Sequence, residues 1–470
     1  MPPLRLQCFR WFCAAVLAAS GQLAVSTSGA AEKAATAPAR DGFITIDSLA
    51  TLREFAGRSG VKVRLKPGTY TLDQASSRHF IALTGDDTHW DLRGVTLRID
   101  TNLFRQIAAS PGGSGSFYCA FSLTGNRITF EGLRTENFGD RPGLQSRNKI
   151  FDLTGSDIVL RDVDITTSGS SPWGHGSLFG ISGGDVRKMN GIRVGWPARN
   201  VSLVGCRVHM RAMGHGIFVQ GARDTLIQDC HVDGLLRSTN DILAEKSGYA
   251  FERAFMTRGH GYIEGVNVGA DGRILHDEMI ALSEDGIRLY EGAGKGQPTG
   301  PTRIVDCTVS RMRRGFCTGL SSSADTLVNC VARECVATGF NVGSRDGLQA
   351  CRADARYSEA LSLPYVNSHD ATVELELLDS RGGLANDLLA VVNGRSHRIT
   401  LRTPDPAFVP PGFAIELATH RGYAHYQKAE ALARDIVLRL NTAAPVVQNP
   451  GAQRNEIVRE DTDALSAPTR

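Results

Sequence analysis

The sequence of 470 residues lacks several features that would assign it to a common class of protein. It has no strict Gly-X-Y period, which excludes collagen. No stretch approaches eighteen continuous apolar residues, so we predict no membrane span. Basic and acidic residues nearly balance, 52 against 49, and this balance argues against nucleic acid or an anionic membrane surface as the partner. Aromatic residues make up only 7% of the chain.

Motifs for common cofactors are also missing. There is no phosphate loop, no dinucleotide fingerprint, no nucleophile elbow and no C-x-x-C zinc pattern. We therefore predict no cofactor and no metal site. Calcium stays open because acidic residues are frequent, but none of them has the spacing of a ligand set.

The first thirty residues are typical of a secretory signal peptide. Arg5 and Arg10 give a positive start, a ten-residue apolar run follows, and small residues near Ala30 suit cleavage. We predict a signal peptide over residues 1–30, a linker over 31–41, and a secreted or periplasmic protein.

The rest of the sequence repeats with a period of twenty-odd residues. Segments such as NVSLVGCRV and DTLIQDCHV alternate apolar with other residues, as half-buried strands do. Five of these segments carry a cysteine at the same position: Cys206, Cys230, Cys307, Cys330 and Cys351. Three of the four steps are 24, 23 and 21 residues. The step of 77 between Cys230 and Cys307 fits either three coils or fewer coils with a large insertion.

A second series of strands begins with glycine. Its members start at Gly191, Gly216, Gly286, Gly315 and Gly339. Self-similarity at this period, with several short strands in each unit, predicts a solenoid. No leucine-asparagine consensus and no helical segment marks the repeat, so we predict an all-β parallel β-helix in which glycine occupies the bends.

Residues 61–72, VKVRLKPGTYTL, place Pro-Gly-Thr-Tyr between two strands. This segment resembles the first coil of pectate-lyase-like right-handed parallel β-helix proteins, and residues 48–56 resemble the short amphipathic helix that caps that solenoid. The resemblance implies one right-handed β-helix domain over residues 42–458, followed by a flexible tail over 459–470. It does not fix the chemistry, because this fold hosts lyases, hydrolases, epimerases and non-catalytic adhesins.

In such a fold the aligned cysteines would stack inward as buried free thiols. Cys317 and Cys335 lie outside the series, so a disulfide between them is the alternative. Insertions at 101–117, 166–190 and 235–300 interrupt the repeat, and long insertions of this kind are usually functional.

Strand alternation predicts a row of side chains on the outer face of the second series. Its members are Arg193, Phe218, Gln220, Arg288, Tyr290 and Asn341. Arginine pairs with carboxylates and aromatic faces stack on sugar rings, so this row suits an acidic polysaccharide. An ordinary solvated face is the alternative.

The insertion 235–300 concentrates ionisable side chains. Removal of a uronate C5 proton needs a base, a positive charge beside the carboxylate and an acid for the leaving oxygen. Lys246 or His260 could be the base, Arg258 and Arg288 the positive charges, and Tyr262 the acid. The sequence around Lys246 and His260 is similar to the Lys-Ser and Arg-His-Gly motifs of alginate and dermatan-sulfate lyases. An ion-paired surface insertion is the alternative.

A glycoside hydrolase would instead need two carboxylates beside the glycosidic bond. Candidates are Asp241, Glu284, Asp285 and Glu291. Gly-His-Gly around His260 resembles polygalacturonases. The triplet also surrounds His175 and His215, and we rank His175 and His260, which lie on insertions, above His215, which lies at a bend.

We therefore hypothesise an exported polysaccharide lyase acting on a uronic-acid glycan. A glycoside hydrolase is the first alternative and a non-catalytic glycan-binding protein the second. In each case the expected partner is a polysaccharide, and the oligomeric state stays open.

Overall fold

The computed structural model describes most of the chain. The described residues are 41–72, 79–103, 119–139, 147–170, 172–179, 186–257, 268–294, 296–384 and 386–460. All belong to one compact unit, Thr36–Arg470. The predicted signal peptide and the last ten residues lie outside the described part.

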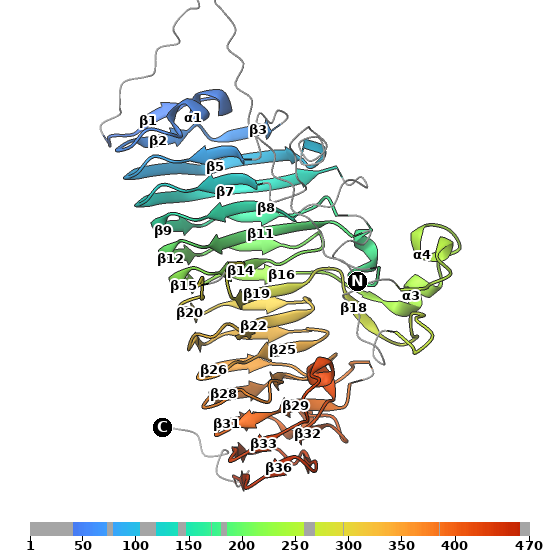
Figure 1. Cartoon of the computed structure of the whole chain (residues 1–470). Helices are drawn as coiled ribbons and strands as arrows, with labels where there is room; N and C mark the ends of the chain where they lie inside the picture. Colours follow the sequence, from blue (N-terminus) through green and yellow to red (C-terminus); the bar gives the residue numbers. More distant parts are fainter. Residues whose placement is uncertain are drawn as a thin grey trace, which may run out of the picture. The chain divides into compact units, whose positions relative to one another are not determined.

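Parallel strands stack coil upon coil, in chain order from blue to red in Figure 1. In the described residues they form two long sheets, A with 20 strands and B with 12. Sheet B contains β4 (His79–Leu83), β6 (Cys119–Leu123), β8 (Arg147–Leu153), β11 (Lys188–Gly195), β14 (Ile217–Gln220), β19 (Asp285–Tyr290), β22 (Arg314–Leu320), β25 (Thr338–Asn341), β27 (Leu361–Leu363), β29 (Leu388–Val392), β32 (Ala414–Leu417) and β35 (Val446–Gln448).

Sheet A supplies the other long wall. It contains β1 (Ile44–Ile46), β2 (Lys62–Leu65), β3 (Gly68–Leu72), β5 (Thr88–Asp100), β7 (Ile128–Phe138), β9 (Ser156–Arg161), β10 (Asp164–Thr166), β12 (Arg199–Val204), β13 (Arg207–His209), β15 (Arg223–Gln228), β16 (His231–Asp233), β20 (Thr302–Val305), β21 (Thr308–Ser310), β23 (Thr326–Val328), β24 (Val331–Arg333), β26 (Gly347–Ala353), β28 (Thr372–Leu377), β31 (Arg398–Arg402), β34 (Val437–Leu440) and β37 (Glu456–Arg459). A short third sheet joins β30 (Gly394–Arg395), β33 (Ala433–Arg434) and β36 (Ala452–Gln453).

The two predicted strand series correspond to the two long sheets. Segments with an aligned cysteine belong to sheet A, and segments that begin with glycine belong to sheet B. β15 pairs directly with β20, so the step of 77 residues is one coil with a large insertion. The insertion holds the antiparallel pair β17 (Leu236–Ser238) and β18 (Met279–Ala281) and the short helices α3 (Thr239–Leu243) and α4 (Tyr249–Glu252).

The interior is a continuous apolar core between the sheets. The rings of Phe121 and Phe151 stack with centroids 5.0 Å apart, and Phe316 stacks on Phe340 at 4.9 Å. The five aligned cysteines are buried in this core as free thiols. The alternative disulfide between Cys317 and Cys335 is wrong: both are free, because Cys335 packs in the core while Cys317 lies in the outward row of β22, where its thiol donates to Asn341 Oδ1.

The glycines that begin the strands of sheet B have another role than the one predicted. Many bends with positive φ in sheet A are formed by aspartate or asparagine, such as Asp157 and Asn200, and glycine occupies others, such as Gly205 between β12 and β13. Gly286 does not have a positive φ; a Cβ there would lie 2.2 Å from Val309 Cγ1. These glycines are needed because side chains of sheet A pack directly against their backbone.

Helix α1 (Leu49–Phe55) lies at the first coil, as predicted. Ser48 Oγ accepts a hydrogen bond from the Thr51 backbone N–H, and Leu52 and Phe55 are buried against the core. The 3₁₀ helices of the described part are η1 (Trp173–His175), η2 (Pro406–Phe408) and η3 (Gly422–Tyr426). None of the described helices is long and apolar enough to cross a membrane.

Candidate active site

The predicted outer row is a single register of sheet B. Ile192 and Val194 point into the core, and Arg193 between them faces outward. Strand pairing places one residue per coil in this outer row: Ser122, Asp152, Arg193, Phe218, Arg288, Cys317, Asn341 and Ser362. Successive members are about 4.8 Å apart, the spacing of neighbouring strands.

A second polar column runs beside this row. Each member lies just before a sheet-B strand or among the first three residues of that strand. The register places these residues in consecutive coils: Lys149, Asn190, His215, Asp285, Arg314, Thr338 and Glu359. The column contains groups of both charges, and the members of neighbouring coils contact one another.

Asp285 is the most heavily paired carboxylate of the column. It accepts two hydrogen bonds from Arg314, Nε to Oδ1 at 2.6 Å and Nη2 to Oδ2 at 2.5 Å. Arg288 Nη1 donates to Oδ2 at 3.1 Å, and Arg313 Nη2 lies 3.4 Å from Oδ1. Burial alone would raise the pKa of Asp285, but these guanidinium groups outweigh it and hold the pKa well below its usual range.

Glu284 is a second buried carboxylate. Its Oε2 is 2.7 Å from Lys188 Nζ, and its Oε1 is 3.5 Å from Arg313 Nη2. Burial raises its pKa, yet the charges of Lys188, His215 and Arg313 lower it by more, so that Glu284 stays ionised.

His215 lies between the two carboxylates and Arg288. Its Nδ1 is 3.4 Å from Asp285 Oδ2, and its Nε2 is 3.3 Å from Arg288 Nη1 and 3.4 Å from Glu284 Oε2. Burial lowers the pKa of His215 to about 3, against the opposing effect of Glu284. The imidazole is therefore neutral at neutral pH.

The charged side chains around His215 and along the neighbouring row, here called the cluster, differ in their access to solvent. The side chains of Glu284 and Asp285 are 1% and 0% exposed, whereas those of Lys188, Arg193, Arg288 and Arg313 are 16–20% exposed. The formal charges also differ in number. The cations are Lys149, Lys188, Arg193, Arg288, Arg313 and Arg314, six in all, against the three carboxylates Asp152, Glu284 and Asp285. The solvent-facing side of the cluster is thus positive.

Two aromatic rings border Arg288. Phe218 and Tyr290 stack with centroids 5.9 Å apart and planes 14° apart, and the Arg288 guanidinium lies 4.6 Å from the centre of the Tyr290 ring. Burial raises the pKa of Tyr290, so its phenol is protonated at neutral pH and can donate. Gln220 is paired in register with Tyr290 one coil earlier.

Three charged residues, Lys149, Asp152 and Arg193, form the side of this cluster nearest the N-terminal coils. Asp152 accepts from Arg193 Nη1 at 3.0 Å and from Lys149 Nζ at 3.3 Å. Burial lowers the pKa of Lys149, and Asp152 offsets part of that shift. This trio holds Arg193 beside Phe218.

The candidate residues on the insertion either lie away from this cluster or fall outside the described part of the chain. Lys246 and Asp241 are exposed, and Figure 1 shows α3 and α4 projecting from the stacked strands. Arg258, His260 and Tyr262 are not among the described residues, so their roles stay predictions.

His175 and Glu291 have partners of their own. His175 Nε2 is 3.2 Å from Glu245 Oε1, and Arg237 donates to the same oxygen at 2.6 Å. Glu291 accepts backbone N–H groups of Thr299 at 2.9 Å and of Ser322 at 2.6 Å, which ties two loops together.

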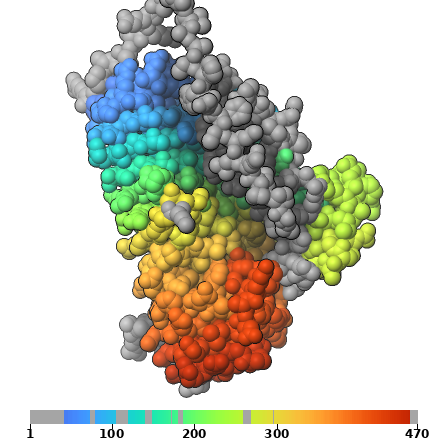
Figure 2. Space-filling model, in the orientation of Figure 1, coloured from blue at the N-terminus to red at the C-terminus, as the bar shows by residue number. Residues whose placement is uncertain are grey.

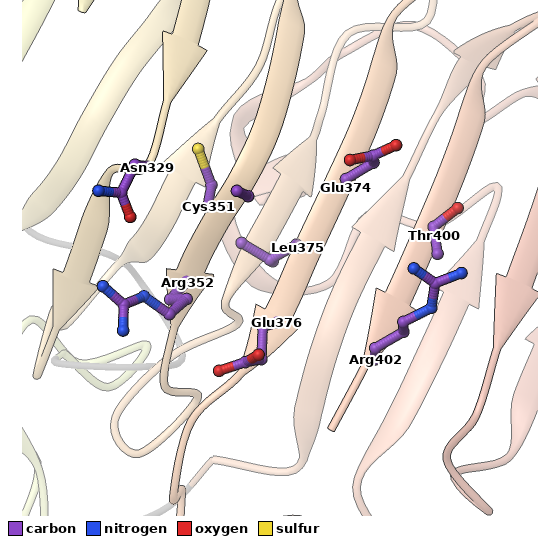
Figure 3. A pocket seen from close by; sticks show the side chains of 9 residues that line it. Asn329, Cys351, Arg352, Glu374, Leu375, Glu376, Thr400 and Arg402 are labelled. Atoms are coloured by element: carbon purple, nitrogen blue, oxygen red, sulfur yellow. The ribbon is translucent and has the colours of Figure 1, made fainter. Parts of the chain in front are cut away.

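A separate hollow of about 480 Å³ lies on the outer face of sheet A. Figure 3 shows Arg352, Glu374, Glu376 and Arg402 around it, on neighbouring strands. Glu376 is paired in register with Arg352 on one side and Arg402 on the other. The hollow is lined by two basic and two acidic side chains that face solvent, and by no residue of the polar column. Among the described residues, no group of three or more His, Cys, Asp or Glu side chains is arranged to hold a metal ion.

Sequence reasoning did not find several members of the cluster. His215 received a low rank because it lies at a bend, and Lys188, Arg313, Arg314 and Asp152 were not singled out. The signal was available, because a polar residue directly before the glycine recurs in the second series. Only the pairing register shows that these residues stack.

The structure has the right-handed parallel β-helix fold of pectate-lyase-like proteins. It is similar to a mannuronic acid specific polysaccharide family 6 lyase from human gut microbiota, with a TM-score of 0.50 and 13% identity over 90% of this chain and 84% of the other. It also matches pectate lyase Pel9A, with a TM-score of 0.37 and 11% identity over 86% and 72% of the chains. A third match is polygalacturonase from Erwinia carotovora ssp. carotovora, with a TM-score of 0.38 and 9% identity over 93% and 100%. No family model and no curated protein matches the chain.

Proposed function

We propose that the protein is an exported polysaccharide lyase that cleaves a uronic-acid glycan at the outer face of sheet B. The contact between buried His215 and partly exposed Arg288, with Nε2 and Nη1 3.3 Å apart, carries this proposal. It supplies a proton acceptor and a carboxylate-binding cation within one site, which is the combination that β-elimination requires.

The reaction follows from these positions. Arg288 and Arg193 pair with the substrate carboxylate, and their charge stabilises the dianion that forms when the C5 proton leaves. The Asp285 backbone N–H donates to His215 Nδ1 at 3.4 Å in the structure, and Arg288 Nη1 lies 3.3 Å from Nε2. The reaction requires the other arrangement, with the imidazole proton on Nδ1, toward Asp285 Oδ2, and Arg288 turned from Nε2 to the substrate, so that the Nε2 lone pair accepts the C5 proton. The C4–O bond then breaks, the C5 electron pair forms the C4=C5 double bond, and the Tyr290 phenol protonates the departing oxygen.

The buried carboxylates serve positioning in this scheme. Asp285 orients His215 and Arg288, and Glu284 anchors Lys188 and Arg313. Hydrolysis would require a carboxyl group that is protonated at neutral pH to protonate the leaving oxygen. Glu284 and Asp285 both have lowered pKa values, which disfavours them as that acid.

The proposal is tested on a panel of alginate, pectate, hyaluronan and dermatan sulfate. An ultraviolet-absorbing unsaturated product from one of these glycans is expected. New reducing ends without that absorbance would instead indicate a hydrolase, and binding without new ends a glycan-binding protein.

Replacement of Arg288 tests the role of the positive charge. Arg288→Lys cannot form the same two-pronged contact with a carboxylate, so we expect kcat/KM to fall by about 100-fold or more. The control is Arg303→Lys, an exposed site on sheet A, where activity should be unchanged. Equal activity of the two variants would contradict the proposed site.

A further inference from the structure

The outer row does not stay open along the whole of sheet B. Arg193 and Arg288 are partly exposed, but the next three members, Cys317, Asn341 and Ser362, are 0% exposed although they belong to the outward register. Phe218, between the two arginines, is also buried, at 4% exposed, where its ring stacks on Tyr290. The side chains of Cys317, Asn341 and Ser362 are smaller, so their complete burial requires cover from another part of the chain.

Residues 419–432, here called the strap, lie over this part of the row. Helix η3 of the strap contacts β27 and β29, and Figure 2 shows the orange-red part of the chain on the surface beside the orange coils. Arg314 Nη1 donates to the Tyr423 hydroxyl, and the Tyr423 backbone N–H donates to Glu359 Oε1 at 2.8 Å. Ala424 packs with Leu388 and Val391 in a small buried cluster.

The side chains beneath the strap are suited to a polar ligand. The Asn341 side-chain nitrogen is buried without a hydrogen-bond partner. A buried amide without a partner costs free energy, so such groups usually mark a position that a ligand or water occupies. Asn341 lies in the same register as Arg193 and Arg288, two coils beyond Arg288 along the direction that a bound glycan would follow.

We propose that the strap ends the glycan-binding row at Arg288 and thereby sets the length of the substrate segment that the site binds. This inference rests on the proposed function. The open stretch from Arg193 to Arg288 spans two coil steps, about 10 Å. Displacing the strap would extend the row over Cys317 and Asn341 and add contacts for further sugar units.

Gly422 offers a point substitution that loosens the strap. Its φ is +54°, and a Cβ there would lie 2.9 Å from both carboxyl oxygens of Glu359. Gly412 is the matched control, because its φ is also positive, at +89°, and nothing lies within 4 Å of its Cβ position. Gly422→Ala should therefore lift the strap, whereas Gly412→Ala introduces backbone strain alone. A variant with residues 421–428 replaced by two glycines gives a second way to remove the cover.

Cys317 reports the cover directly, without any glycan. Labelling with a maleimide, mapped by mass spectrometry, should modify Cys317 in Gly422→Ala and in the shortened variant but not in the wild type or Gly412→Ala. Cys307, inside the core, should stay unlabelled in every folded variant. An unreactive Cys317 in both strap variants would overturn the inference and leave the proposed function intact.

Binding of alginate, pectate and hyaluronan oligosaccharides of increasing length tests the consequence. In the wild type and Gly412→Ala, affinity should stop increasing at a short length, and in the strap variants it should continue to increase with longer oligosaccharides. Identical length profiles with a reactive Cys317 would overturn the inference. Absence of binding by every variant would contradict the proposed function, and with it the inference that rests on that function.

Discussion

Each buried charge at the outer face of sheet B is stable only because an oppositely charged partner lies next to it. Asp285 is fully buried and holds Arg314, Arg288 and Arg313, so its charge compensates guanidinium groups that have little access to water. Removing one member of a buried ion pair leaves the other desolvated and unpaired, which is far more costly than the loss of an exposed pair.

At the scale of single residues, Asp285→Asn should destabilise the protein by about 3–5 kcal/mol. Urea-induced unfolding measures this change. The control is Asp435→Asn, which removes a pair with Arg454 at the surface and should leave the free energy of unfolding nearly unchanged. Similar effects of the two substitutions would show that the Arg314 pair is not a source of stability.

The row of outward residues illustrates what can be predicted for single residues. Alternation along each strand predicts that Arg193, Phe218 and Arg288 face outward, because successive side chains of a strand point to opposite sides. The importance of His215 could not be predicted in this way. Its pKa depends on burial and on Glu284, which lies 69 positions away in the sequence and next to it in space.

Glycines at or near the start of sheet-B strands allow these strands to approach sheet A closely. Gly191, Gly216 and Gly286 have virtual Cβ positions within 2.6 Å of Val208, Val232 and Val309 respectively. The contact is between opposite walls of a coil, so no local turn preference accounts for these glycines. Sequence periodicity reveals the glycine series but not its cause.

At the scale of the element, Gly286→Ala should destabilise the protein by about 1–3 kcal/mol, the usual effect of overpacking a core. The added methyl group would lie 2.2 Å from Val309 Cγ1. Gly347→Ala, with nothing within 4 Å of the Cβ position, is the control and should change stability little. Thermal unfolding of the two variants side by side distinguishes steric conflict from a general cost of losing glycine.

Proton binding by groups in the site affects the stability of the whole solenoid, since its coils share one continuous core. Burial raises the pKa of Glu359 from 4.5 to about 8. The folded state therefore keeps this proton over a range in which the unfolded chain has released it. On account of Glu359, stability is greatest below pH 4.5 and falls as the pH rises to about 8.

At the scale of the whole molecule, Glu359→Gln should remove this part of the pH dependence. Gln cannot ionise, so the stability of the variant relative to the wild type should increase between pH 5 and pH 8. Denaturant unfolding at a series of pH values measures the difference, and a constant difference would contradict a raised pKa. His215 has the opposite effect on stability. Its pKa of about 3 lies below the ordinary 6.5, so its contribution to the stability of the folded state is lost as the pH falls from 6.5 toward 3.

The sequence by itself determined the parallel β-helix, the two strand series, the buried cysteine stack and the outward direction of the Arg193–Arg288 row. These features depend on local alternation and on a repeat that a linear pattern records. Only the tertiary structure decided that the long step is one coil with an insertion, that His215 lies among Glu284, Asp285 and Arg288, and that the strap contacts Arg314 and Glu359. Each of these contacts joins residues far apart in the sequence, and the burial that sets their charge states exists only once the coils have stacked.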